Sequence, residues 1–181
     1  MAILPITVYG DPVLRKIASP IKQVDDGIIG LIQNMFATMR NANGIGLAAN
    51  QVDIDKQIFI VDISPVEGYE KFKPVVMINP EIILQSDETV VMEEGCLSLP
   101  NLRADVERPE AIKVRYLDTD ENIQEIEADD LFARVILHEY DHLIGKLIPD
   151  RVNEQIRKKL QEELELIRNR EVKVDYPITP K

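Results

Sequence analysis

Three stretches of the chain repeat apolar residues at the three- and four-residue spacing of an amphipathic helix. Residues 25–43 form the first stretch, with aspartates at its start as N-cap candidates and an Asn-Gly pair at its end. The second stretch begins at Asp129 or Asp130 and stops at Gly145, a residue type that commonly ends helices. The third stretch follows Pro149, and its apolar stripe consists of Val152, Ile156, Leu160, Leu164 and Ile167. This pattern predicts an N-terminal helix, a helix late in the chain and a C-terminal helix.

Between the first two helices the pattern changes to short runs rich in β-branched residues. Clusters of Pro, Gly and Asp separate these runs, which cover residues 58–63, 75–78, 89–92, 112–116 and 123–126. A short turn rich in Asp and Asn joins the last two runs, as in a β-hairpin. We therefore expect an α+β fold, with mostly antiparallel β-sheets around the helix late in the chain and with an N-terminal and a C-terminal helix.

The chain of 181 residues is expected to form a single domain over residues 1–181, since no repeat or linker divides it. Its last part, about residues 168–181, matches no motif and is expected to be a flexible tail. A domain of this length buries roughly 70% of its unfolded surface, so it needs neither disulfides nor a structural metal for stability. Any metal that the chain binds is therefore expected to serve a function.

Composition narrows the classes of function. The chain has 21 Lys and Arg against 32 Asp and Glu, and the resulting net charge of −11 repels nucleic-acid phosphates. Direct DNA binding is therefore not expected. A single cysteine excludes an internal disulfide and favours a reducing compartment. The start lacks the residue order of a secretory signal and no apolar run approaches a membrane span, so we expect a cytoplasmic protein without membrane contact.

The two histidines of the chain, His138 and His142, stand four positions apart, with Glu139 directly after the first. On a helix this spacing places both imidazoles on one face, one turn apart, where both can bind one metal ion. The pattern H-E-x-x-H is therefore typical of a metal site, and two ordinary core or surface histidines are the alternative. We interpret the helix late in the chain as a central metal-binding helix.

The third ligand is sought among the residues that remain. No histidine follows His142, and the acidic residues after it fit the solvated face of the C-terminal helix better. Cys96, in E-G-C-L-S, is the only cysteine; alone it would be an inert buried thiol, but with two imidazoles it suits Fe²⁺ or Zn²⁺. Three ligands are too few for a closed structural zinc site, which leaves one position open to water or substrate. Glu139, rotated about 100° around the helix from His138, is a candidate general base, and this set indicates hydrolysis of a carbonyl compound.

A second motif, G-I-G-L-A-A-N-Q at residues 44–51, directly follows the first helix. Its small residues let another backbone approach closely, and the amide of Gln51 can donate a hydrogen bond to a developing oxyanion. The alternative interpretation is a glycine that ends the helix, followed by two alanines in tight packing.

Together, G-I-G-L-A-A-N-Q at 44–51, E-G-C-L-S at 94–98 and H-E-Y-D-H at 138–142 resemble the three signature motifs of the peptide deformylase family, in the family's order. The similarity extends from V-Y-G-D-P-V-L-R at 8–15 to L-I-G-K at 143–146. The resemblance implies a metal-dependent hydrolase that removes the N-formyl group from the initiator formylmethionine of newly made polypeptides and releases formate. Its expected partners are N-formylmethionyl nascent peptides, and the ribosome is a further candidate.

The resemblance also implies roles for residues of this chain in catalysis. The metal ligands would be Cys96, His138 and His142. They would bind catalytic Fe²⁺, which Zn²⁺, Ni²⁺ or Co²⁺ can replace. Glu139 would act as general base and acid, while Gln51 and the backbone N–H of Leu97 would hold the oxyanion as water attacks the formyl carbon.

The same resemblance implies which residues bind the substrate. Ile45 and Gly46 would meet the substrate backbone, and Glu94 would hold Gln51 in place, although a plain surface carboxylate is the alternative for Glu94. The methionine side chain would enter an apolar pocket lined by Ile45, Leu131, Val135 and His138. For the residues on the helix face, ordinary core packing is the alternative.

Two other functions remain open from the sequence. A different metal-dependent amidase with the same ligands would turn over unformylated peptides. A non-catalytic metal-binding interaction module would instead use its acidic surface to meet a protein partner. The intact Glu139 and Gln51 argue against this second alternative.

Overall fold

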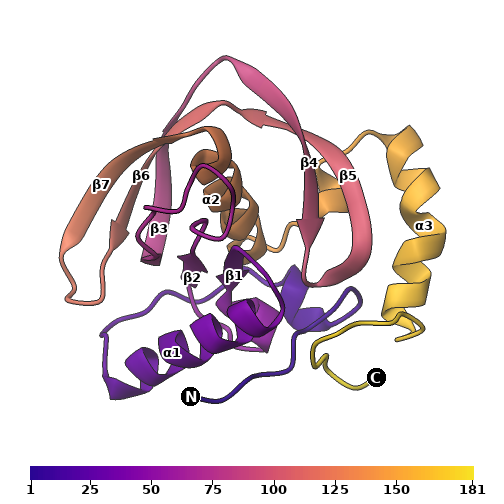
Figure 1. Cartoon of the computed structure of the whole chain (residues 1–181), viewed down its shortest axis with the longest axis horizontal. Coiled ribbons are helices and arrows are strands. Elements are labelled where there is room, and N and C mark those ends of the chain that lie inside the picture. Colours follow the sequence, from indigo (N-terminus) through magenta and orange to yellow (C-terminus); the bar gives the residue numbers. More distant parts are fainter.

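The computed structural model describes all residues of the chain, 1–181, and confirms the α+β prediction. Figure 1 shows two antiparallel sheets on either side of a central helix. The larger sheet has five strands in the order β1 (Gly46–Ala48), β2 (Ile58–Val61), β3 (Val75–Gln85), β6 (Ala111–Leu117) and β7 (Ile123–Asp129). The smaller sheet is a hairpin of β4 (Thr89–Cys96) and β5 (Leu99–Pro109). All neighbouring strands run antiparallel, as predicted.

The three predicted helices are α1 (Asp26–Asn41), α2 (Asp130–Leu143) and α3 (Glu154–Arg168). Three short 3-10 turns join the other elements: η1 (Pro12–Arg15), η2 (Ala49–Val52) and η3 (Ile148–Asp150). α1 begins where predicted, because the side chain of Asp25 accepts a hydrogen bond from the Ile28 N–H. Asp129 is the N-cap residue of α2, although its side chain makes no capping hydrogen bond. No helix combines the length and the apolar character that crossing a lipid bilayer requires.

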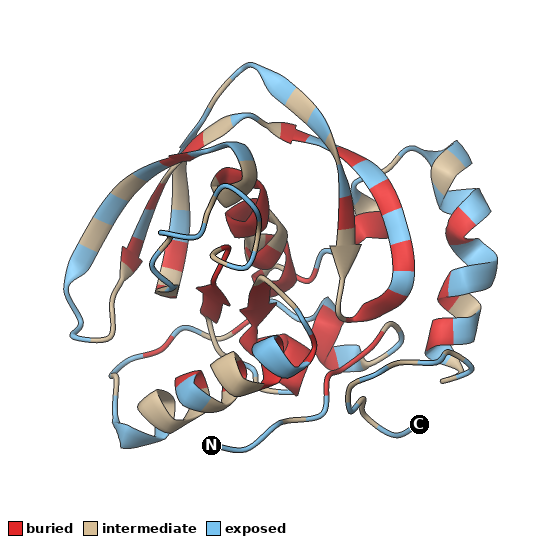
Figure 2. Ribbon diagram, viewed as in Figure 1, coloured by how far each residue is buried: buried red, intermediate tan, exposed pale blue.

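α2 runs through the middle of the molecule, between the larger sheet and the hairpin, and is buried over much of its length (Figure 2). On β2, Phe59 and Val61 pack in the same apolar cluster as the residues of α2. Ile58 and Ile60 point to the opposite face of the sheet and pack with α1. α3 packs against the buried side chains of β5 in a third apolar cluster. The helix that carries the predicted metal ligands is therefore held between two sheets.

The sequence pattern did not predict β5 or the short strand β1. The inward-pointing residues of β5 are Leu102, Ala104, Val106 and Arg108, and the residues between them are exposed. A small alanine and a charged arginine on the inward face obscure the two-residue alternation by which a strand is recognised. Arg108 can occupy an inward position because buried carboxylates pair with its charge.

Residues 168–181, which we expected to be a flexible tail, contact the N-terminal segment in the structure. The first of these residues ends α3, and the rest fold back against the N-terminal segment (Figure 1). Ile178 forms a parallel bridge with Ile6, and the hydroxyl of Thr179 donates a hydrogen bond of 2.6 Å to Asp11. No local pattern could indicate this anchoring, because the partners lie at the other end of the chain.

Candidate active site

The end of β4 and the middle of α2 bring the three predicted metal ligands together. Cys96 is the last residue of β4, while His138 and His142 lie one turn apart on α2. One ligand atom from each residue lies within 4.8 Å of the other two. The Nε2 atom of His142 is 3.3 Å from the Sγ atom of Cys96. The tertiary structure thus brings together the three residues that spacing and composition had selected.

The donor atoms of this cluster suit a divalent metal ion. Nδ1 of His138 is 2.7 Å from Oε1 of Glu94, which leaves Nε2 of the same ring available to a metal. His142 is buried, and its Nδ1 has no hydrogen-bond partner. Burial opposes a charge on His138, but the hydrogen bonds to Cys96 and Glu94 outweigh burial and raise the pKa of His138. Burial and the neighbouring His138 lower the pKa of His142, which keeps that ring neutral, and a thiolate with two imidazoles matches Fe²⁺ or Zn²⁺.

Glu94 contacts His138 and not Gln51, which corrects the role expected for it. Besides His138, its carboxylate accepts hydrogen bonds from Arg108 at 2.7 Å and from Arg134 at 2.8 Å. These donors carry charge, so they bind a carboxylate more strongly than the neutral amide of Gln51 does. Burial alone would raise the pKa of Glu94, but the hydrogen bonds from His138 and Arg108 lower it well below its usual value. Glu94 is therefore an anion that fixes the orientation of the His138 ring.

Sequence reasoning missed the charged residues that support Glu94. Arg108 donates a hydrogen bond of 2.8 Å to Asp141, and both side chains are buried. Asp141 also accepts hydrogen bonds from Arg151, which is partly exposed. Burial disfavours the charge of Arg108, but Glu94 and Asp141 outweigh burial and raise its pKa. Charged side chains of alternating sign therefore connect His138 to the protein surface. In the sequence, the one feature that could indicate this network is Arg108, a charged residue at an inward position of β5.

Replacing Glu94 with glutamine is expected to destabilise the protein strongly. The change leaves the buried charge of Arg134 without a counterion and leaves Arg108 with Asp141 alone, which lowers the free energy of unfolding by about 3–5 kcal/mol. Because folding lowers the pKa of Glu94, its stabilising contribution is present above the unfolded pKa of about 4.3 and is lost as the pH falls below it. Urea unfolding at several pH values should therefore show a weaker loss of stability in acid for the variant than for the wild type.

The matched control is Glu125→Gln on β7, which removes the same charge from an exposed pair with Arg115. This change is expected to lower the free energy of unfolding far less than Glu94→Gln does, because water screens the pair. Equal effects of the two substitutions would show that Glu94 does not neutralise buried charge.

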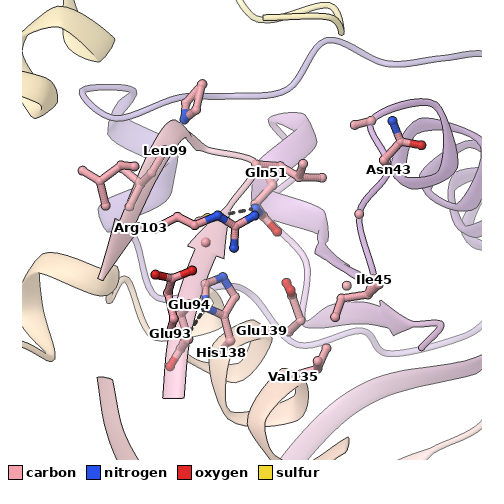
Figure 3. A pocket seen from close by; sticks show the side chains of 18 of the residues that line it. Asn43, Ile45, Gln51, Glu93, Glu94, Leu99, Arg103, Val135, His138 and Glu139 are labelled. Atoms are coloured by element: carbon pink, nitrogen blue, oxygen red, sulfur yellow. Dashed lines mark hydrogen bonds and ion pairs between the residues drawn. The ribbon is translucent and has the colours of Figure 1, made fainter. Parts of the chain in front are cut away.

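Glu139 lies in the same space as the metal-ligand cluster, on the helix turn between the two histidines. Its side chain is only 3% exposed, and its Oε2 has no hydrogen-bond partner. Figure 3 shows its carboxylate directed into the region that also contains the side chains of Gln51 and His138. Burial raises the pKa of Glu139 to about 7, a value suited to accepting and returning a proton near neutral pH. A buried oxygen without a partner is unfavourable in a purely structural residue, so this carboxylate is the candidate for proton transfer.

Gly46 on β1 makes room for the Glu139 carboxylate. A Cβ atom at residue 46 would lie 2.9 Å from both Cγ and Cδ of Glu139, closer than non-bonded carbon atoms approach. The absence of a side chain at Gly46 is therefore necessary for the position of Glu139.

Gly46→Ala is accordingly expected to displace the Glu139 carboxylate and to lower kcat by about 10²-fold, as misplacement of a catalytic group does. The protein should still fold, because the carboxylate is the flexible end of its side chain. Gly30→Ala on α1 is the control, since a Cβ atom there meets nothing within 4 Å. Turnover and thermal melting of both variants check the prediction, and an unchanged kcat for Gly46→Ala would contradict it.

Gln51, on η2, presents its amide NH₂ group to the cluster. Its Oε1 accepts a hydrogen bond of 2.8 Å from the Ala48 N–H, which fixes the orientation of the amide. Its Nε2 is then 3.2 Å from Oγ of Ser98 and 3.6 Å from Sγ of Cys96. Leu97 follows Cys96 in the turn between β4 and β5 and lines the same cavity. Both predicted oxyanion donors therefore lie beside the metal-ligand cluster.

A cavity of about 760 Å³ opens at the cluster, within the range of sites for small organic ligands (Figure 3). The predicted site residues that line it are Ile45, Gly46, Gln51, Glu94, Cys96, Leu97, Leu131, Val135, His138 and Glu139. His142 lies deeper and does not reach the cavity wall. The cavity also has a lining residue that sequence reasoning missed, Tyr176 from the C-terminal tail.

Comparisons with known proteins agree with this arrangement. The family model described as polypeptide deformylase matches residues 3–158 of the chain. A peptide deformylase from Chlorobium phaeobacteroides (strain BS1) is 48% identical over 178 residues, which cover 97% of this chain and 95% of the relative. The crystal structure of a peptide deformylase from Legionella pneumophila has a TM-score of 0.85 and 34% identity, with 94% and 98% of the two chains covered. The structure of the peptide deformylase from Ehrlichia chaffeensis in complex with actinonin has a TM-score of 0.85 and 35% identity, with 96% and 100% covered.

Proposed function

Since the chain belongs to the peptide deformylase family, we propose how its own residues carry out the reaction of that family. The protein is a hydrolase that removes the N-formyl group from the initiator formylmethionine of newly made polypeptides and releases formate. The observation that carries our assignment of roles is the buried carboxylate of Glu139, whose unpartnered oxygen lies at the cavity next to the Cys96, His138 and His142 cluster.

Cys96, His138 and His142 would hold the catalytic metal ion, and we propose that this ion is Fe²⁺ in the cell. Zn²⁺, Ni²⁺ or Co²⁺ could replace it, since the same donor atoms accept them. When bound, the ion supplies Lewis-acid activation of the attacking water. The role of Glu94 is to hold the His138 ring through Nδ1, so that Nε2 stays available as a ligand atom.

Glu139 takes the proton of the attacking water and then gives it to the amine nitrogen as the carbon–nitrogen bond breaks. An amide nitrogen leaves readily only after protonation, so one carboxylate that accepts and returns the same proton serves both steps. Two observations support this role. Burial raises the pKa of Glu139 to about 7, so the carboxylate can both accept and release a proton near neutral pH, and its Oε2 has no hydrogen-bond partner that would compete for the proton.

Gln51 and the backbone N–H of Leu97 donate hydrogen bonds to the formyl oxygen as it gains negative charge. The Ala48 N–H holds the Gln51 amide in one orientation before substrate binds, which spares the enzyme that reorganisation during the reaction. An amide NH₂ has two hydrogens. One bonds Ser98, and the other makes only a long contact of 3.6 Å with Sγ of Cys96, which the formyl oxygen of the substrate can replace.

The substrate backbone binds along β1, which is an edge strand of the five-stranded sheet. The Ile45 carbonyl accepts a hydrogen bond of 2.9 Å from the Asp62 N–H, on the β2 side of the strand. Because polar groups alternate sides along an antiparallel strand, the N–H and C=O of Gly46 face the opposite edge. A peptide placed there would extend the sheet by one strand. Leu131 and Val135 would then form, with Ile45, the apolar pocket for the methionine side chain.

We also propose that the protein acts in the cytoplasm on nascent peptides at the ribosome. Formylated amino termini arise there during protein synthesis, so the enzyme meets its substrate as the chain emerges. The single cysteine agrees with a reducing compartment, because its thiolate must stay reduced to serve as a ligand.

Formate release from a formyl-Met peptide by anaerobically prepared protein tests the proposed function. We expect formate and a free amino terminus in equal amounts, while the matched unformylated peptide stays intact. Turnover of the unformylated peptide would identify a different metal-dependent amidase. Metal binding without turnover of either peptide would identify a non-catalytic module.

A further inference from the structure

We propose that Tyr176, from the C-terminal tail, is a positioning residue that holds the turn at Leu97 in its active shape. The hydroxyl of Tyr176 donates a hydrogen bond of 2.8 Å to the carbonyl oxygen of Leu97. Tyr176 also lines the cavity, although the match to the family model ends at residue 158. The inference rests on the proposed function, because it concerns the Leu97 N–H as an oxyanion donor.

The Leu97 carbonyl belongs to the central peptide of a tight turn. Leu97 and Ser98 are the two residues between β4 and β5, where Cys96 pairs with Leu99. Turns of types I and II differ by a flip of this central peptide, which changes ψ of the first turn residue by about 150°. A hydrogen bond to the Leu97 carbonyl therefore selects one of these orientations. The Leu97 N–H belongs to the peptide directly before this one, and the two peptides share the Cα atom of Leu97. Fixing the Leu97 carbonyl therefore also limits the movement of the Leu97 N–H.

Other hydrogen bonds hold the second residue of the turn but not the first. The Ser98 carbonyl accepts a hydrogen bond of 2.9 Å from the Tyr9 N–H, and Oγ of Ser98 is 3.2 Å from Nε2 of Gln51. The hydroxyl of Tyr176 adds the contact at Leu97. With this contact, hydrogen bonds hold both Leu97 and Ser98, the two residues of the turn that follows Cys96.

The tail is anchored on both sides of Tyr176. Before it, the side-chain amide of Asn101 donates a hydrogen bond of 3.1 Å to the Lys173 carbonyl. After it, the Ile6 N–H donates a hydrogen bond of 2.8 Å to the Pro177 carbonyl. Because the backbone is fixed on both sides of Tyr176, its side chain loses little conformational entropy when the hydroxyl binds the Leu97 carbonyl.

The hydroxyl of Tyr176 also stays protonated under assay conditions. Burial, assisted by the negative charge of Cys96, raises the pKa of Tyr176 above its usual value. The hydrogen bond to Leu97 therefore persists across the neutral pH range, and its loss should not alter the shape of a pH profile.

Tyr176→Phe removes only the hydroxyl and tests the inference in the metal-replete full-length enzyme. We expect kcat for a formyl-Met peptide to fall about 3- to 10-fold, the effect of losing one neutral hydrogen bond, with KM and the pH profile unchanged. Amide hydrogen exchange over residues 96–99 should become faster. Tyr116→Phe on β6 is the matched control, because Tyr116 is a buried tyrosine that does not line the cavity. It should change neither measurement.

A wild-type kcat in metal-replete Tyr176→Phe would overturn the inference, and so would an effect confined to KM. A second variant, truncated after Arg170, removes the tail and should lower kcat at least as much as Tyr176→Phe. An unchanged kcat in the truncated enzyme would also overturn the inference. Failure of the wild type to release formate would instead contradict the proposed function, so the two failures are distinguishable.

Discussion

Glu139→Gln is expected to lower kcat for a formyl-Met peptide by about 10²–10⁴-fold while metal content stays at the wild-type level. Glutamine has nearly the shape of glutamate but cannot accept a proton, so binding is preserved and proton transfer is lost. The metal should remain because its three candidate ligands belong to other residues. A neutral side chain is also easier to bury than a carboxylate with an unpartnered oxygen. We therefore expect the variant to be at least as stable as the wild type.

If Glu139→Gln loses activity but keeps its stability, Glu139 acts in proton transfer and does not have a structural role. Turnover assays measure kcat, metal analysis measures the metal content, and urea unfolding measures the stability. The control is Glu163→Gln, which removes the same charge from the exposed face of α3. It should leave kcat and metal content unchanged. Wild-type turnover by metal-loaded Glu139→Gln would rule out the assigned role.

Loss of any one of the three ligands is expected to remove stoichiometric metal and to lower formate release to the background rate. The variants are Cys96→Ser, His138→Ala and His142→Ala. A site with three protein ligands loses a third of its donor atoms in each of them, and the metal then dissociates. The fold should persist, because the apolar cluster around α2 contains none of the metal ligands. Circular dichroism spectra should therefore match that of the wild type.

Metal analysis after anaerobic purification measures this prediction and also tests the identity of the ion. The wild type should contain about one iron per chain, whereas each variant should contain little metal of any kind. Full occupancy in Cys96→Ser would mean that the third ligand has been misassigned. Zinc in place of iron in the anaerobically prepared wild type would contradict the proposal of Fe²⁺ but not the ligand set.

The helices and the two histidines of the candidate metal site could be predicted because their information is local. The apolar periodicity of α2 reports which side is buried, and the spacing of His138 and His142 places both rings on one face of any helix. Cys96 then followed from composition, since no other cysteine competes with it. The motif around Gln51 indicated that its amide is a hydrogen-bond donor, but only the structure shows the contact with Ala48 that orients this amide.

The partners of the polar side chains were decided only by the tertiary structure. Glu94 was expected to contact Gln51, yet it meets His138 because β4 lies alongside α2, and no sequence spacing specifies that arrangement. Arg108 obscured strand β5 because a charge on an inward face is tolerated only when distant carboxylates neutralise it. Tyr176 reaches Leu97 because the tail pairs with the N-terminal segment. Periodicity therefore determined which faces are buried, whereas the pairing of charged and polar groups depended on segments that meet only after folding.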